Sequence, residues 1–168
     1  MDKKRLTSCP KLPARPGTYV LWLRNNTRIG LEIGSLGRCV FPQGWYFYVG
    51  SAFGPGGLAA RAGRHLKPDK PCRWHIDYLT AVLPVSRIWI STWPEHLECS
   101  WATILMHMGG QIPVKRFGAS DCRCPGHLLR FGTRPSLNRF RAIAQNPVRC
   151  LKNPSADLDG PGLNPPQK

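Results

Sequence analysis

WYFYV, residues 45–49, is the clearest β-strand in this sequence. It is a run of aromatic and β-branched residues that follows a Pro-Gln-Gly turn, and this composition favours a strand buried in a sheet. A second run of the same kind, TYVLWL, occupies residues 18–23. Two shorter strands are expected between them, at residues 29–33 and 38–41, joined by turns. The first third of the chain is therefore predicted to form an antiparallel meander with short loops.

The middle of the chain is expected to carry helices with one strand between them. An Ala-rich helix is predicted over residues 58–66, after a Gly-Pro-Gly-Gly break. A second helix is predicted over residues 74–83, and a strand over 85–91. Thr92 and Glu95 have the spacing of a capping box, so a third helix is expected from there to about residue 108. This order of elements indicates an α+β fold in which helices flank a small antiparallel sheet.

Beyond the third helix the pattern is weaker. We expect an extended segment at residues 112–117, a Cys-rich loop at 120–127, a short strand at 128–131 and a basic helix at 136–145. The chain is accordingly divided into a flexible basic leader (1–15), a folded domain (16–131) and a basic, largely disordered tail (132–168).

The net charge of +15 is the strongest property of the composition. Such an excess attracts polyanions, so DNA is the expected partner, ahead of an anionic membrane surface or a merely solvated basic face. The membrane alternative is weakened because no apolar run is long enough to cross a bilayer. The residues expected to contact nucleic acid are Arg64, Lys67, Arg73, Arg130, Arg139 and Arg141.

The cysteine content predicts free thiols. The number of cysteines, 7, is odd, and their spacing does not form a disulfide framework. Because no secretory signal opens the chain, a reducing cytoplasm is the expected compartment.

Several polar residues have the chemistry of a phosphodiester-cleaving site. Tyr19 and Tyr48 lie at comparable places on strands that should pair, where a phenol can position water; the alternative is that both are core aromatics. Arg61 and His65 share one face of the first predicted helix, and Arg has the planar fork that matches a phosphate. Glu98 lies one turn beyond Glu95, which the capping box explains, and its carboxylate is a ligand suited to Mg²⁺ or Mn²⁺.

These residues and two longer motifs resemble the GIY-YIG nuclease superfamily. The signature elements are GTY at residues 17–19 and YVG at 48–50. WHIDYL at 74–79 and FGASDCxCxxHL at 117–128 resemble more closely a small prokaryotic GIY-YIG-like family of poorly defined function, which also occurs fused to a base-excision glycosylase. The resemblance covers roughly residues 16–131. The two signature elements are unusually far apart, which an inserted hairpin would explain.

The resemblance implies one-metal hydrolysis of DNA by a small sheet flanked by helices. It makes Tyr19 the general base or water-positioning group and Tyr48 its hydrogen-bonded helper. Arg61 would hold the scissile phosphate and Glu98 would bind Mg²⁺. His65 would either lie behind these groups or contact the phosphate.

Four residues near Glu98 allow a second metal site. Cys122, Cys124 and His127 are close in sequence, and Cys99 adjoins Glu98. Four such ligands suit a structural Zn²⁺, although packed thiols with a capping histidine are the alternative. The sequence therefore leaves three classes open: a DNA endonuclease, a nucleic-acid-binding module that does not cut, and a zinc-stabilised adaptor for a DNA-repair protein.

Overall fold

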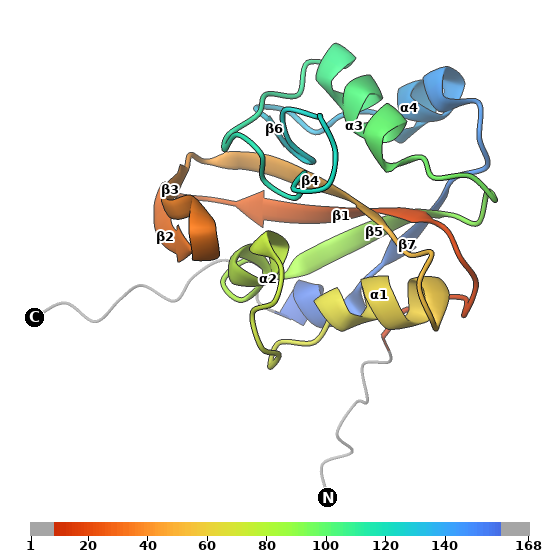
Figure 1. The fold of residues 1–168 in the computed structure, drawn as a ribbon, viewed down its shortest axis with the longest axis horizontal. Coiled ribbons are helices and arrows are strands. Elements are labelled where there is room, and N and C mark those ends of the chain that lie inside the picture. Colours follow the sequence, from red (N-terminus) through yellow and green to blue (C-terminus); the bar gives the residue numbers. More distant parts are fainter. Residues whose placement is uncertain (1–8, 159–168) are drawn as a thin grey trace, which may run out of the picture.

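A five-stranded antiparallel sheet forms the centre of the molecule in the computed structural model, which describes residues 9–158 (Figure 1). The order of its strands is β6-β4-β1-β5-β7. β1 lies in the middle and pairs with β4 in unbroken register, from Thr18 opposite Ser51 to Asn25 opposite Gly44. The strands are β1 (Thr18–Asn25), β4 (Gly44–Ser51), β5 (Val85–Ser91), β6 (Leu128–Phe131) and β7 (Arg149–Lys152).

The hairpin predicted between the two signature strands is present. β2 (Ile29–Ile33) and β3 (Gly37–Phe41) form their own two-stranded sheet, joined by a 3-10 turn at Gly34–Leu36. One continuous meander was therefore the wrong expectation. β2 alternates half-buried and exposed residues and packs beside the main sheet, which leaves β1 and β4 free to pair directly.

Helices cover both faces of the sheet, as the α+β prediction requires. α1 (Gly57–His65) and α2 (His75–Thr80) lie on one face, and α3 (Glu98–His107) and α4 (Leu137–Ala144) lie on the other (Figure 1). The central strand explains this arrangement, because β1 is apolar on both sides. Tyr19 and Leu21 belong to one hydrophobic core, while Val20 and Trp22 belong to the other.

Three predicted elements differ from the structure. The third helix begins at Glu98, so the capping box proposed for Thr92 and Glu95 does not form. α2 is shorter than the predicted helix over residues 74–83. Residues 112–117 form no strand, and only Gln111 makes a bridge, to Arg130.

The folded domain extends beyond the predicted boundary at residue 131. β7 pairs with β5, and Phe140 of α4 is fully buried against Trp89 and Trp101, at ring distances of 4.9 and 5.1 Å. The prediction of a largely disordered tail is therefore wrong for residues 137–153. Residues 159–168, the rest of that predicted tail, lie outside the described part of the chain.

The end of the predicted leader is also part of the fold. The carbonyl oxygens of Pro13 and Arg15 accept hydrogen bonds from the backbone N–H groups of Ala59 and Leu58, at 3.0 and 2.9 Å. These bonds satisfy two backbone N–H groups in the first turn of α1, which have no partners within the helix. Residues 1–8 lie outside the described part of the chain.

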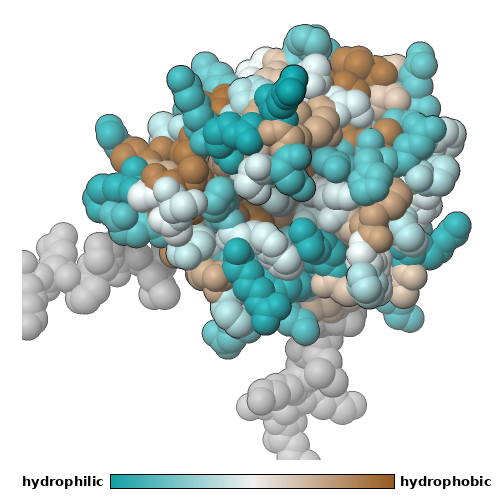
Figure 2. Space-filling view, viewed as in Figure 1, coloured by the Kyte–Doolittle hydropathy of each residue, from teal (hydrophilic) through white to brown (hydrophobic). Residues whose placement is uncertain are grey.

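The face of the molecule seen in Figure 2 is largely hydrophilic. Figure 2 shows polar residues over much of one face, with hydrophobic residues in small separate patches. Among the helices within residues 9–158, none has the length and apolar character needed to cross a membrane.

Candidate functional site

A pocket of about 240 Å³ opens where β1 begins and β4 ends. It brings together Tyr19, Tyr48, Arg61 and Glu98, which come from four different elements. The remaining lining residues come from β4, the start of α2 and the loop before β6: Val49, Gly50, Ser51, Arg73, Trp74, His75, Gly118, Ser120, Asp121 and His127. The structure thus places these four predicted site residues around one polar cavity.

The two signature elements interlock at this pocket. Tyr19 lies opposite Gly50 in the β1–β4 register, and its ring crosses the space that a Cβ atom at Gly50 would fill. Tyr48 lies opposite Leu21, two residues along, so both tyrosines face the same side of the sheet. The glycine of the second element is therefore required by the tyrosine of the first.

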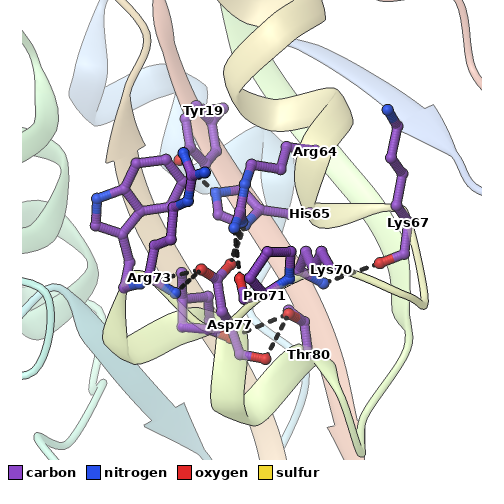
Figure 3. A network of polar contacts seen from close by, with 11 residues as sticks. Tyr19, Arg64, His65, Lys67, Lys70, Pro71, Arg73, Asp77 and Thr80 are labelled. Carbon is purple, nitrogen blue, oxygen red and sulfur yellow. Dashed lines mark hydrogen bonds and ion pairs between the residues drawn. The ribbon is translucent and has the colours of Figure 1, made fainter. Parts of the chain in front are cut away.

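The Tyr19 hydroxyl is hydrogen-bonded to His65 rather than to Tyr48 (Figure 3). The oxygen lies 2.9 Å from Nε2 of His65, and no bond between the two tyrosines occurs within residues 9–158. Nδ1 of His65 lies 3.4 Å from Oδ1 of Asp77. Because His65 is only 3% exposed, it cannot contact a phosphate, and of its two expected roles only a place behind Tyr19 remains.

Burial sets the protonation of this chain of groups. Burial and the neighbouring Tyr48 raise the pKa of Tyr19 far above its usual value, against the opposing charge of Arg61. Burial also raises the pKa of Tyr48 to about 12. Burial lowers the pKa of His65, although Asp77 pulls in the other direction. At neutral pH the phenols are therefore protonated and the imidazole is neutral, so Nε2 can accept the Tyr19 proton.

Asp77 organises the supporting structure. Its fully buried carboxylate accepts hydrogen bonds from Arg64 at 2.8 Å and from the backbone N–H groups of Arg73 and Trp74 at 2.9 and 3.0 Å (Figure 3). The last two bonds cap the start of α2. Burial raises the pKa of Asp77, but its contacts with His65, Trp74, Arg73 and Arg64 outweigh that effect and lower it.

Arg61 and Arg64 lie on the same helix but have different surroundings. Arg64 also donates to the carbonyl oxygen of Pro71 at 2.6 Å, so its guanidinium is held by protein partners. The structure thus gives Arg64 a structural role in place of the predicted contact with nucleic acid. Arg61 is exposed, lies 4.0 Å over the ring of Trp74 and borders the pocket.

Glu98 is the first residue of α3. The N–H of the preceding residue, Leu97, donates to Oγ1 of Thr18 at 3.3 Å, which ties the helix start to the first signature element. Oε1 of Glu98 lies 3.5 Å from Nδ1 of His96, whereas Oε2 is buried and has no hydrogen-bond partner in the described part of the chain. A buried carboxylate oxygen without a partner lowers the stability of the fold, and a bound cation would supply the missing partner.

The other predicted nucleic-acid contacts are not gathered at the pocket. Arg73 lines it, but Lys67 and Arg139 are exposed elsewhere. Arg130 donates to the carbonyl oxygen of Gln43 at 2.6 and 3.0 Å, and Arg141 donates to that of Val148 at 2.7 and 3.0 Å. These two guanidinium groups therefore hold in place the loops that contain Gln43 and Val148.

Sequence reasoning missed several contacts that support the pocket. Thr18, in the first signature element, anchors the start of α3 through its hydroxyl. His75 accepts a hydrogen bond from the N–H of Gly118 at 3.2 Å, which fastens the pocket loop to α2. His96 stacks on Phe53 at a ring distance of 4.0 Å beside Glu98. Thr18 and His75 had a signal in the sequence, because they belong to the motifs at residues 17–19 and 74–79, whereas His96 belongs to neither.

A cysteine and histidine cluster lies next to the pocket. The ligand atoms of Cys99, Cys122, Cys124 and His127 all lie within 4.8 Å of one another, so this group can hold a metal ion. Burial lowers the pKa of His127, which leaves a neutral imidazole able to coordinate. Burial and the neighbouring thiols raise the pKa of Cys99. The backbone of His127 is fixed by hydrogen bonds with Val49 and Phe117, at 2.9 and 2.8 Å.

Fold and site together define a small α+β domain with one polar pocket at the end of its sheet and a metal-ligand cluster beside it. The chain belongs to the family described as "Domain of unknown function DUF123", whose model matches residues 18–148. Comparisons with curated proteins and with solved structures gave no match.

Proposed function

We propose that this protein is a metal-dependent endonuclease that hydrolyses DNA phosphodiester bonds in DNA repair or processing, with the chemistry of the GIY-YIG nucleases that it resembles. One observation carries the proposal. Tyr19, Tyr48, Arg61 and Glu98 are far apart in the sequence, yet they line a single pocket, and one carboxylate oxygen of Glu98 is buried without a partner among residues 9–158.

DNA is the proposed substrate because of the charge of the chain and the two arginines of the pocket. The net charge is +15, and the pocket carries the guanidinium groups of Arg61 and Arg73 beside the carboxylates of Glu98 and Asp121. A guanidinium binds a phosphate through two parallel hydrogen bonds, and stacking on Trp74 orients that of Arg61 toward such a contact. Arg61 would therefore hold the scissile phosphate while Arg73 holds a neighbouring one.

Tyr19 and His65 provide a route for the proton of the attacking water. As the water oxygen bonds to phosphorus, its proton passes to the Tyr19 hydroxyl, and the phenolic proton passes to Nε2 of His65, 2.9 Å away. The bond from phosphorus to the leaving sugar oxygen breaks, and that oxygen takes a proton from solvent. Asp77, 3.4 Å from Nδ1, stabilises the imidazolium that forms.

Glu98 is the proposed ligand for Mg²⁺ or Mn²⁺. One carboxylate with water and substrate phosphate is a common way for proteins to hold these hard cations. The ion would neutralise charge that develops on the phosphate. The neighbouring cluster has soft thiolate donors, so its metal is proposed to be Zn²⁺ instead.

A non-catalytic nucleic-acid-binding module with the same fold is the alternative, and the net charge supports it equally well. Binding alone needs no carboxylate in the pocket, so Glu98 favours the enzyme.

Incubation of the protein with nicked, flapped and plain duplex DNA, in Mg²⁺ or in EDTA, separates the two. We expect cleavage in Mg²⁺ only, and a loss of at least roughly 100-fold in Tyr19→Phe, because a positioned acid–base group is worth about that much. Tyr78→Phe, which removes a hydroxyl elsewhere in the same core, should cut normally. Tight binding without cleavage of any substrate contradicts the proposal.

A further inference from the structure

We infer that a Zn²⁺ ion held by Cys99, Cys122, Cys124 and His127 fixes the position of Glu98, so that the pocket is complete only in the zinc-loaded protein. The zinc ligands are thus positioning residues, and none of them is proposed to touch the substrate. The part of this inference that concerns Glu98 rests on the proposed function, whereas the zinc site itself does not.

The geometry of the cluster fits one zinc ion. A tetrahedral zinc with bonds of about 2.3 Å to sulfur and about 2.0–2.1 Å to nitrogen separates its ligand atoms by about 3.5–3.8 Å. Nε2 of His127 lies 3.8 Å from Sγ of Cys99 and 3.5 Å from Sγ of Cys122. A [4Fe–4S] cluster would hold its ligands further apart, because each of its four ligands binds a different iron.

The ligand set is that of a structural site. Three thiolates and one imidazole complete the tetrahedron and leave no open position for water or substrate. His127 borders the pocket, but coordination occupies the ring nitrogen that lies among the thiols. Zinc would therefore contribute to this protein by holding segments together.

Zinc would join two segments that both contribute residues to the lining of the pocket. Cys99 lies in the first turn of α3, while the other ligands lie in the irregular loop between α3 and β6. Arg116 shapes that loop by donating to the carbonyl oxygens of Cys122 and Cys124, at 2.6 and 2.9 Å. Ser120 and Asp121 of the same loop line the pocket. A bond to zinc from each segment would fix how these two parts of the pocket lining lie relative to each other.

Few contacts in the described chain hold the Glu98 side chain itself. The hydrogen bond from the Leu97 N–H to Thr18 fixes the backbone at the start of α3, whereas the Glu98 carboxylate has exposed His96 beside it, at 3.5 Å. Once it binds zinc, the neighbouring residue, Cys99, would give this turn a second anchor. Loss of zinc would release the carboxylate while the five-stranded sheet remains intact.

Metal analysis of the purified full chain, grown with zinc, gives the first test. One zinc per chain is expected, and cobalt substituted for zinc should give the visible absorption of a tetrahedral thiolate site. Cys122→Ser and Cys124→Ser should each lose most of the metal, whereas Cys72→Ser, an exposed cysteine outside the cluster, should keep it. Wild-type protein without zinc, or zinc retained in both cluster variants, contradicts the inference.

Amide hydrogen exchange before and after chelation gives a test that needs no activity. Removal of zinc from the wild-type protein should speed exchange at residues 98–103 and 116–127, leave β1, β4 and β5 protected, and reverse when zinc is restored. In parallel, the affinity of the protein for Mn²⁺ should fall at least tenfold when zinc has been removed, to the affinity of the Glu98→Gln variant. If exchange does not change when zinc is removed, the positioning role is overturned. It is also overturned if zinc removal leaves Mn²⁺ binding unchanged while the Glu98→Gln variant no longer binds Mn²⁺.

The two proposals fail in different ways. If the zinc-loaded protein shows the expected exchange and Mn²⁺ binding but cuts no DNA, the endonuclease proposal fails and the positioning of Glu98 by zinc stands. If the protein cuts DNA at full rate after zinc has been removed, with DNA affinity unchanged, the endonuclease stands and the positioning role is wrong.

Discussion

At the scale of single residues, the site depends on His65 being buried and neutral. Its ring has 3% exposure and sits between Tyr19 and Asp77. Burial keeps its pKa below the ordinary value, so the imidazole can accept a proton at neutral pH. A histidine on the surface of α1 would have suited phosphate binding, whereas this one suits a relay behind Tyr19.

This arrangement predicts how the cleavage rate depends on pH. The rate should be level through neutral pH and fall on acidification through the pKa of His65, which lies below about 6.5, because protonated Nε2 cannot accept the Tyr19 proton. Single-turnover rates between about pH 5 and 8 measure this. His65→Gln should be slow and lack this acid limb. A wild-type rate that rises on acidification is inconsistent with the relay.

The sequence predicted that Arg61 and Arg64, on one helix, would both contact DNA, and could not show that Arg64 has a protein partner. They lie three residues apart, and both are arginines on a helix with other basic residues. The difference comes from Asp77, which lies in another helix and takes Arg64 as its partner. Roles that depend on a distant partner of this kind are not visible in local spacing.

At the scale of elements, the pairing of β1 with β4 and the start of α2 hold the pocket together. Asp77 caps α2 and binds Arg64, and its pKa is lowered in the folded state by its contacts. A carboxyl group whose pKa is lowered on folding stabilises the protein above its unfolded pKa of about 3.9 and loses that contribution as the pH falls.

Asp77→Asn should therefore lower the free energy of unfolding at pH 7 by about 3–5 kcal/mol, because Arg64 loses its buried partner. The deficit relative to wild type should shrink as the pH falls below about 4. Urea denaturation at several pH values measures both effects. Asp69→Asn, at an exposed position, is the control, and an equal effect in the two variants would argue against the network.

Elements with a strong apolar pattern were predictable and those fixed by tertiary contacts were not. The strands around Tyr19 and Tyr48 and the hairpin between them follow from runs of aromatic and β-branched residues. The start of α3 could not be predicted from the sequence, because the N–H of Leu97 is satisfied by Thr18 from a distant strand rather than by a local cap. β7 was missed because it is a short edge strand of mixed polarity.

The C-terminal elements are expected to be essential for folding. A chain that ends at residue 131 loses Phe140, which fills a fully buried space between Trp89 and Trp101, and loses the partner of β5. It should show no cooperative unfolding transition by circular dichroism, because an empty site of that size costs about 3–5 kcal/mol. A chain that ends at residue 158 should unfold like the full chain. Equal stability of both truncations contradicts this account of the domain.

At the scale of the whole molecule, the charge of +15 predicts binding to DNA that weakens steeply with salt. Removal of an arginine that contacts phosphate should reduce the slope of log affinity against log salt by about 1. Fluorescence anisotropy without added Mg²⁺ or Mn²⁺, which prevents cleavage and leaves the zinc site loaded, should show this for Arg61→Ala and Arg73→Ala. Arg64→Ala should keep the slope and lose stability instead, because its partner is Asp77. Identical slopes in all three variants would count against the pocket as the DNA site.

The account depends most on Glu98 as the ligand of the proposed catalytic metal, and one comparison tests it directly. The rate of Mg²⁺-dependent DNA cleavage should fall by at least roughly 100-fold in Glu98→Gln, as expected when a metal-held transition state loses several kcal/mol. Glu95→Gln, which changes an exposed glutamate three residues away, should keep the wild-type rate. A Glu98→Gln protein that cuts as fast as Glu95→Gln would contradict the account.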